Sequence, residues 1–143
     1  MINAEKVVKV LNKKYSINKV DYAIVVGSGL MDSVPELEDV TIVAYDKLGM
    51  PKSKVKGHSG KFIFGRYADK NVVLVSRLHY YESGEMGKVR LPFEIIANLG
   101  VKKVVLLTSS GGINKTFRVG DIMLIKDHIN FSEVSPLRGK NLD

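Results

Sequence analysis

The chain contains no cysteine and no tryptophan, and only three histidines among its 143 residues. Without cysteine it can form no disulfide, no thiolate metal site and no cysteine nucleophile. The three histidines do not stand at metal-ligand spacing from one another. The sequence therefore predicts a protein without a bound metal.

Long apolar runs are also missing, and the first residues do not predict a secretory leader. Charged residues interrupt every apolar run well before the ~20 residues that a membrane-spanning helix needs. Residues 1–6 lack the basic-then-apolar pattern of a secretory signal. We therefore expect a cytoplasmic protein without a membrane partner. The hydrophobic fraction of 45% is typical of a globular protein, and the length predicts a single unit over residues 1–143 without an internal boundary.

The net charge of +7 raises the question of a nucleic-acid partner. The lysines are scattered, no predicted helix carries a basic stripe, and aromatic residues do not alternate with basic ones. The pattern thus predicts a solvated surface and no nucleic-acid binding. Part of the charge could steer a small anionic substrate toward the protein.

Apolar periodicity predicts two helices. The first spans residues 3 to 15, with Asn3 as its N-cap. The second has Pro92 in its first turn, or begins as early as Met86, and ends at Gly100.

Short apolar runs predict buried strands at 22–26, 40–43, 61–65, 72–75 and 104–107. Residues 68–71 fit a hairpin connection, and residues 45–57 fit a surface loop. Residues 119–130 read as a turn that leads into one more strand. Strands and helices mixed in this way predict an α/β fold.

Three of these strands are followed by residues suited to binding an anion. The strand 22–26 leads into Gly27, Ser28 and Gly29, which can offer backbone amides and a hydroxyl to a phosphate. This turn fits neither a dinucleotide-binding fingerprint nor a Walker loop. The strand 104–107 opens into a small-residue loop at 108–114.

The strand 72–75 is followed by Arg77, His79, Tyr81 and Glu82. Arginine matches phosphate oxygens with its planar fork of donors, and histidine can donate to the same anion near neutral pH. Each motif alone is also consistent with a plain turn or a surface ion pair. Because the carboxyl ends of strands border the ligand crevice of open α/β sheets, three such exits together favour an anion site.

A further histidine, His58, lies between two glycines in residues 57–60. Such a flexible backbone suits a gate over a site, and it equally suits an ordinary turn.

The ordered motifs resemble those of the trimeric purine nucleoside phosphorylases, a family that includes the methylthioadenosine phosphorylases. They lie at residues 27–30, 57–61, 77–82, 109–114, 119–130 and 136–139. The resemblance extends from Tyr22 onward. It implies an α/β fold of the phosphorylase/hydrolase type, with a central mixed, largely parallel sheet that is flanked by helices and incomplete at its C-terminal side. It also implies a homotrimer.

The same resemblance implies reversible phosphorolysis of purine (deoxy)ribonucleosides to a free purine and (deoxy)ribose 1-phosphate. No cofactor is expected, because inorganic phosphate is itself a substrate. The resemblance implies catalytic roles for Arg77 and His79, and a ribose contact for Tyr81. Glu82 would support the phosphate side, and Ser110 and Gly111 would line the floor beneath the base. The implied phosphate ligands are Ser28, His58, Arg77, His79 and the backbone amide of Ser109.

The family's base-recognising residues would lie beyond Asp143, so this chain would supply the phosphate and ribose half of the site. Locally, Met31 stands where the family usually has glycine, and residues 108–110 read Thr-Ser-Ser where Asn-Ala-Ala is usual. A methylthioadenosine phosphorylase and a non-catalytic phosphate- or nucleoside-binding remnant are the alternatives. If half of the fold is absent, we expect exposed sheet edges and apolar surface, and self-association of the chain alone.

Overall fold

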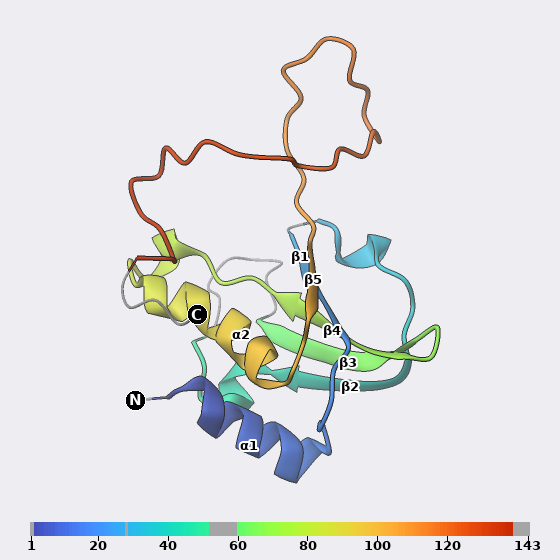
Figure 1. Ribbon diagram of the computed structural model, residues 1–143, viewed down its shortest axis with the longest axis vertical. Coiled ribbons are helices and arrows are strands. Elements are labelled where there is room, and N and C mark those ends of the chain that lie inside the picture. Colours follow the sequence, from blue (N-terminus) through green and yellow to red (C-terminus); the bar gives the residue numbers. More distant parts are fainter. Residues whose placement is uncertain (1, 28, 52–59, 139–143) are drawn as a thin grey trace.

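The computed structural model describes residues 2–27, 29–51 and 60–138, and only the backbone of Glu82. Two helices and five strands form its framework (Figure 1). In chain order they are α1 (Ala4–Tyr15), β1 (Tyr22–Val26), β2 (Glu38–Ala44), β3 (Lys61–Tyr67), β4 (Lys70–Ser76), α2 (Met86–Asn98) and β5 (Lys103–Leu106). Short 3₁₀ turns lie at Met31–Ser33 (η1), Tyr45–Leu48 (η2) and Tyr80–Glu82 (η3).

The strands form one mixed sheet in the order β2-β3-β4-β1-β5. Strands β2, β3 and β4 pair as an antiparallel meander, whereas β1 runs parallel to both of its neighbours, β4 and β5. The predicted α/β class with a mixed sheet is confirmed. Of the four pairings among the described strands, two are parallel.

The hairpin between β3 and β4 closes more tightly than predicted. Tyr67 pairs with Lys70, so that only Ala68 and Asp69 form the turn. Both turn residues have positive φ, 47° and 61°, as a type I′ turn requires. This turn twists in the same sense as the strands that it joins.

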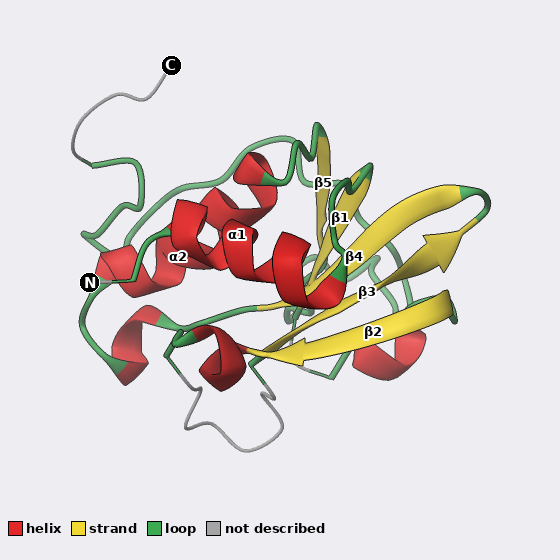
Figure 2. Cartoon of the chain, turned by 90° about the horizontal axis from the view of Figure 1, so that it is seen from below, coloured by secondary structure: helices red, strands yellow, loops and turns green. Residues whose placement is uncertain are grey.

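Both helices cover one face of the sheet, and they lie side by side (Figure 2). Leu11 of α1 and Ile95 of α2 are fully buried against Val25 and Val73 of the central strands. Helix α1 begins as predicted, because the Asn3 side chain accepts a hydrogen bond from the backbone N–H of Lys6 at 3.0 Å. The opposite face carries a smaller apolar cluster of four buried residues, Val26, Leu37, Val72 and Leu74.

Helix α2 begins at Met86, which was the earlier of the two predicted starts. The placement of Pro92 in the first turn was wrong, because this proline lies inside the helix and is buried. Without an N–H it cannot bond to the carbonyl four residues before it. Burial of its ring offsets that loss. Gly100 ends the helical segment with a φ of 82°, as predicted.

Residues 45–51 do not form the predicted surface loop. Tyr45, Leu48 and Met50 are buried there. The Tyr45 ring packs against Phe62 with 4.8 Å between the ring centroids, and its hydroxyl donates to the Ser76 carbonyl oxygen at 2.5 Å. The prediction failed because one short 3₁₀ turn, η2, is too brief to show apolar periodicity.

Strand β5 is the edge of the sheet, and its apolar side chains are exposed. Val104, Val105 and Leu106 keep 45%, 49% and 65% of their surface accessible, although a parallel strand is usually covered on both faces. The expected exposure of apolar surface at a sheet edge is thus confirmed.

After β5 the chain runs away from the folded body (Figure 1). The strand predicted within residues 119–130 is wrong, because residues 107–138 contain no strand. These residues pair with none of the described strands, and their apolar side chains stay exposed. Ile122 and Leu124, for example, keep 99% and 95% of their surface accessible.

Candidate functional site

The parallel pairing of β1 with β4 and β5 brings three strand exits to one end of the sheet. Val26 pairs with Ser76, and Val25 pairs with Leu106. The backbone N–H of Leu107 also donates to the Val25 carbonyl at 2.9 Å, so that the β5 exit stays against β1. Residues that follow these strands therefore start from neighbouring positions.

The close approach at this end depends on Gly27. A Cβ at Gly27 would lie 2.6 Å from Nη2 of Arg77, 2.8 Å from the Leu107 carbonyl oxygen and 3.3 Å from Cα of Thr108. The Arg77 guanidinium thus lies directly over the β1 exit and beside the start of the loop that follows β5. The structure brings together one residue from each of the three predicted anion-binding motifs.

Arg77 is half-buried, and its Nε is shielded from solvent without a hydrogen-bond partner among the described residues. Arg66 of β3 provides the contrast. It donates to Glu38 at 2.8 Å and lies 3.5 Å from Asp39. The bond to Glu38, together with the negative charges of Glu38 and Asp39, raises the pKa of Arg66. Arg66 thus already uses its guanidinium to bind carboxylates, whereas Arg77 keeps a buried donor without a described partner.

His79 and Tyr81 lie just beyond Arg77. Their rings stack with 5.1 Å between centroids and 26° between planes. His79 is half-buried, whereas Tyr81 is 72% exposed. The backbone of Glu82 completes the turn η3. An exposed aromatic face beside a half-buried imidazole is a surface on which a sugar ring can lie.

The loop after β5 meets the site only at its beginning. Ser109, Ser110 and Gly111 are all exposed, and a Cβ at Gly111 would meet no atom within 4 Å. The structure therefore brings this loop to Arg77 at Leu107 and Thr108. Two further predicted site residues, Ser28 and His58, lie outside the described residues.

Tyr45 supports the candidate site, although no motif in the sequence marks it as a functional residue. Burial raises the pKa of Tyr45 well above its ordinary value, so its hydroxyl stays protonated and donates to the Ser76 carbonyl. This bond holds the residue that precedes Arg77. The signal in the sequence was alternation, because Tyr45 follows Val43 by two residues and so lies on the same buried face.

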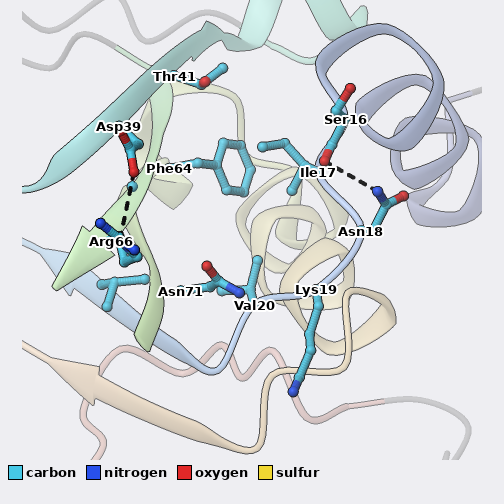
Figure 3. A pocket seen from close by; sticks show the side chains of 12 residues that line it. Ser16, Ile17, Asn18, Lys19, Val20, Asp39, Thr41, Phe64, Arg66 and Asn71 are labelled. Atoms are coloured by element: carbon cyan, nitrogen blue, oxygen red, sulfur yellow. Dashed lines mark hydrogen bonds and ion pairs between the residues drawn. The ribbon is translucent and has the colours of Figure 1, made fainter. Parts of the chain in front are cut away.

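A hollow at the other end of the sheet differs in character (Figure 3). It lies between the α1–β1 connection and the β3–β4 hairpin, with Ile17 and Phe64 facing each other across it. Its guanidinium, Arg66, is the one paired with Glu38 and Asp39. We therefore place the candidate anion site at the three strand exits.

Comparison with known proteins settles the family. The model of the phosphorylase superfamily matches residues 21–143, which is most of the chain. The chain belongs to this superfamily. The match includes all three strand exits, and it confirms the resemblance that the ordered motifs predicted.

Relatives within the superfamily are purine nucleoside phosphorylases. The chain is 40% identical over 124 residues to the purine nucleoside phosphorylase of Mus musculus, a match that covers 83% of this chain and 43% of the relative. It is 33% identical over 139 residues to purine nucleoside phosphorylase 1 of Geobacillus stearothermophilus, covering 96% of this chain and 50% of the relative.

A solved structure gives the same picture. Isoform 2 of the purine nucleoside phosphorylase from Schistosoma mansoni, crystallised with cytosine and ribose-1-phosphate, superposes with a TM-score of 0.85 at 31% identity. The match covers 97% of this chain and 50% of that one. The chain thus spans about half the length of the phosphorylases it matches.

Two further observations bear on partners. Among the described residues, no helix has the length and apolarity needed to cross a bilayer. The same part of the chain holds no group of three histidine, aspartate or glutamate side chains placed to bind a metal.

Proposed function

We propose that this phosphorylase-superfamily chain supplies the phosphate- and ribose-binding part of a purine nucleoside phosphorylase. The reaction is reversible phosphorolysis of a purine (deoxy)ribonucleoside to a free purine and (deoxy)ribose 1-phosphate. One observation carries the proposal: the Arg77 guanidinium lies over Gly27 and against the β5 exit, with a buried donor that no described residue uses.

The proposed roles follow from chemistry. Arg77 binds the phosphate through its fork of donors, and His79 donates to the same anion. Tyr81 lies along the ribose. Phosphate held beneath the anomeric carbon stabilises the oxocarbenium-like sugar electrostatically and then attacks it, so positioning and charge supply most of the catalysis.

The other proposed contacts come from the loops. Ser28, His58 and the backbone amide of Ser109 complete the set of phosphate ligands. Glu82 supports the phosphate side of the site through hydrogen bonding. Ser110 and Gly111 lie under the base.

The purine must leave with hydrogen bonds or a proton at its ring nitrogens. We assign that task to polypeptide corresponding to the half of the relatives that this chain does not match. In the complete enzyme we expect a homotrimer.

Two measurements test the proposal. The first is thermal stability of the chain in inorganic phosphate, at an ionic strength held constant with chloride. We expect phosphate to raise the melting temperature, because a ligand that binds only the folded state stabilises it. The second is purine release from inosine or guanosine with phosphate, using the chain alone and mixed with the C-terminal half of the Geobacillus stearothermophilus relative. We expect release only from the mixture.

Arg77→Ala should abolish the phosphate-dependent stabilisation and the activity of the mixture. Arg66→Ala is the matched control, because it removes the same charge at the opposite end of the sheet and should leave both the stabilisation and the activity intact. Equal effects of the two variants would contradict a site at Arg77. If the mixture binds phosphate but releases no purine, the proposed phosphorylase activity is contradicted.

A non-catalytic phosphate- or nucleoside-binding role is the second candidate. The exposure of Ser109, Ser110 and Gly111 favours it, because a loop without packing does not hold a base firmly. Its signature would be phosphate-dependent stabilisation that is lost in Arg77→Ala, with no turnover in any mixture.

A further inference from the structure

Among the residues that the structure describes, Tyr45 and Ser76 each bury a side-chain hydroxyl, and the Tyr45 hydroxyl is hydrogen-bonded whereas that of Ser76 is not. Ser76 keeps 5% of its surface accessible, and its Oγ has no hydrogen-bond partner among those residues. The four residues before it, 72–75, are all apolar and buried. A buried hydroxyl without a partner destabilises the folded state, and an alanine at this position would avoid that cost.

The position of this hydroxyl is informative. Ser76 immediately precedes Arg77, whose Nε is likewise buried without a described partner. Ser76 also pairs with Val26, the last residue before Gly27. Two consecutive side chains thus hold unused donors at the point where the β1 and β4 exits meet. An anion with several acceptor oxygens can accept from both of them at once.

The backbone around Ser76 is fixed. The Tyr45 hydroxyl donates to its carbonyl oxygen at 2.5 Å, and the parallel ladder with β1 continues through it. The Ser76 hydroxyl can therefore move only by rotation among its side-chain rotamers. A donor held on so rigid a backbone needs little ordering when a ligand arrives.

We infer that Ser76 is a further binding residue of the anion site, and that its hydroxyl donates to the oxyanion held by Arg77. The inference rests on the proposed phosphate-binding function and adds a ligand that the motif comparison did not assign. It explains why the chain carries a buried hydroxyl at a strand position that packing alone would fill with an apolar side chain.

The test compares phosphate binding with intrinsic stability in Ser76→Ala. Inorganic phosphate is titrated by calorimetry and by thermal melting, at constant ionic strength, with wild type, Ser76→Ala, Ser76→Thr and Arg77→Ala. We expect Ser76→Ala to weaken phosphate binding about 10- to 100-fold, since hydrogen bonds to charged groups are among the strongest. Without phosphate its melting temperature should equal or exceed that of wild type.

Ser76→Thr keeps the hydroxyl and should retain most of the affinity. Ser33→Ala, which removes an exposed hydroxyl in η1, is the control and should bind phosphate as wild type does. If Ser76→Ala binds like wild type while Arg77→Ala does not, the inference about Ser76 is overturned and the proposed function stands. If wild type itself gains no stability from phosphate, the proposed function fails, and the inference fails with it.

Discussion

Gly27 shows how a missing side chain can determine a site. Its Cα lies so close to Arg77 and to the Leu107 carbonyl that no Cβ fits between them. Flexible side chains can move aside, but a backbone carbonyl within a parallel pairing cannot. The glycine is therefore required by close approach, since it is not among the glycines with positive φ.

Gly27→Ala should consequently displace the guanidinium and the β5 exit together. We expect it to lower the free energy of unfolding by about 1–3 kcal/mol, as overpacking does, and to remove phosphate-dependent stabilisation. Chemical denaturation and thermal melting in phosphate measure the two effects. Gly87→Ala, in α2 with no atom near its added Cβ, is the control and should stabilise by about 0.5–1 kcal/mol. Equal behaviour of the two variants would exclude a special role for Gly27.

Tyr45 gives the protein a pH dependence at alkaline pH. Burial raises the pKa of the Tyr45 hydroxyl in the folded state. As the pH rises, the unfolded chain therefore loses the phenolic proton before the folded chain does. The stability that this group contributes is complete below its ordinary pKa of about 10 and is lost as the pH rises above that value.

We expect the free energy of unfolding to fall by up to about 1.4 kcal/mol per pH unit above pH ~10 through Tyr45. Urea denaturation between pH 8 and 11 measures the slope. Tyr45→Phe should be less stable at pH 8, because the bond to Ser76 is lost, and should show a shallower slope above pH 10. Identical slopes in the two proteins would refute the assignment.

At single residues, the sequence predicted chemistry better than packing. Arg77 and Gly27 could be found because their residue types and positions after apolar runs have a direct reading. The burial of Tyr45 is indicated in the sequence only by its alternation with Val43. The unpartnered hydroxyl of Ser76 could not be found, because it depends on which strand lies beside which. The predicted roles of Ser28, His58 and Ser109 stay predictions.

Among the elements, the β3–β4 hairpin offers the clearest opportunity for stabilisation. Ala68 adopts a φ of 47°, a conformation that costs a residue with a Cβ roughly 1–2 kcal/mol. Asn-Gly is the preferred pair for a type I′ turn. The turn is thus correct in geometry and poor in composition.

Replacing Ala68-Asp69 by Asn-Gly should raise the free energy of unfolding by about 1 kcal/mol. Thermal melting measures the gain. Ala97→Gly, at an exposed position of α2 with helical backbone, should do the opposite and cost about 1 kcal/mol. A loss of stability in the Asn-Gly variant would show that the turn does not populate the I′ conformation.

Helices and central strands could be predicted because periodicity is a local property. The exceptions share one cause, which is that the neighbours of an element determine what it becomes. Residues 119–130 have the composition of a strand but pair with none of the described strands, and Pro92 lies inside α2 with its ring buried. Pairing partners far along the chain are not visible in a local pattern.

At the scale of the whole molecule, the edge strand β5 is a surface suited to association with another chain. It combines free backbone groups with three partly exposed apolar side chains, and residues 107–138 add more. Such a combination favours edge-to-edge association.

We expect sedimentation of the isolated chain to show a mass that rises with concentration. Val105→Lys, which places a charge at the centre of β5, should reduce the association several-fold. Val10→Lys on α1 is the matched control, because Val10 has a similar exposure of 39% and lies on the helix layer. A monomer at all concentrations, or equal effects of the two lysines, would rule out β5 as the contact.

The architecture could be predicted only in part from the sequence. The mixed α/β class, the element order and the grouping of three exits followed from patterns along the chain. The position of β1 between β4 and β5, which creates the site, did not, because strand order is set by contacts between distant segments.

That position of β1 also bears on the order of events during folding. The meander of β2, β3 and β4 can form from neighbouring segments, whereas Tyr22 must find both Val72 and Lys103 to insert between two strands made much later. Pairings between distant segments form slowly, since a long loop must close first. We therefore expect the earliest strand to leave the ribosome to be among the last to lock in place, so that the phosphate-binding end matures only when the sheet is complete.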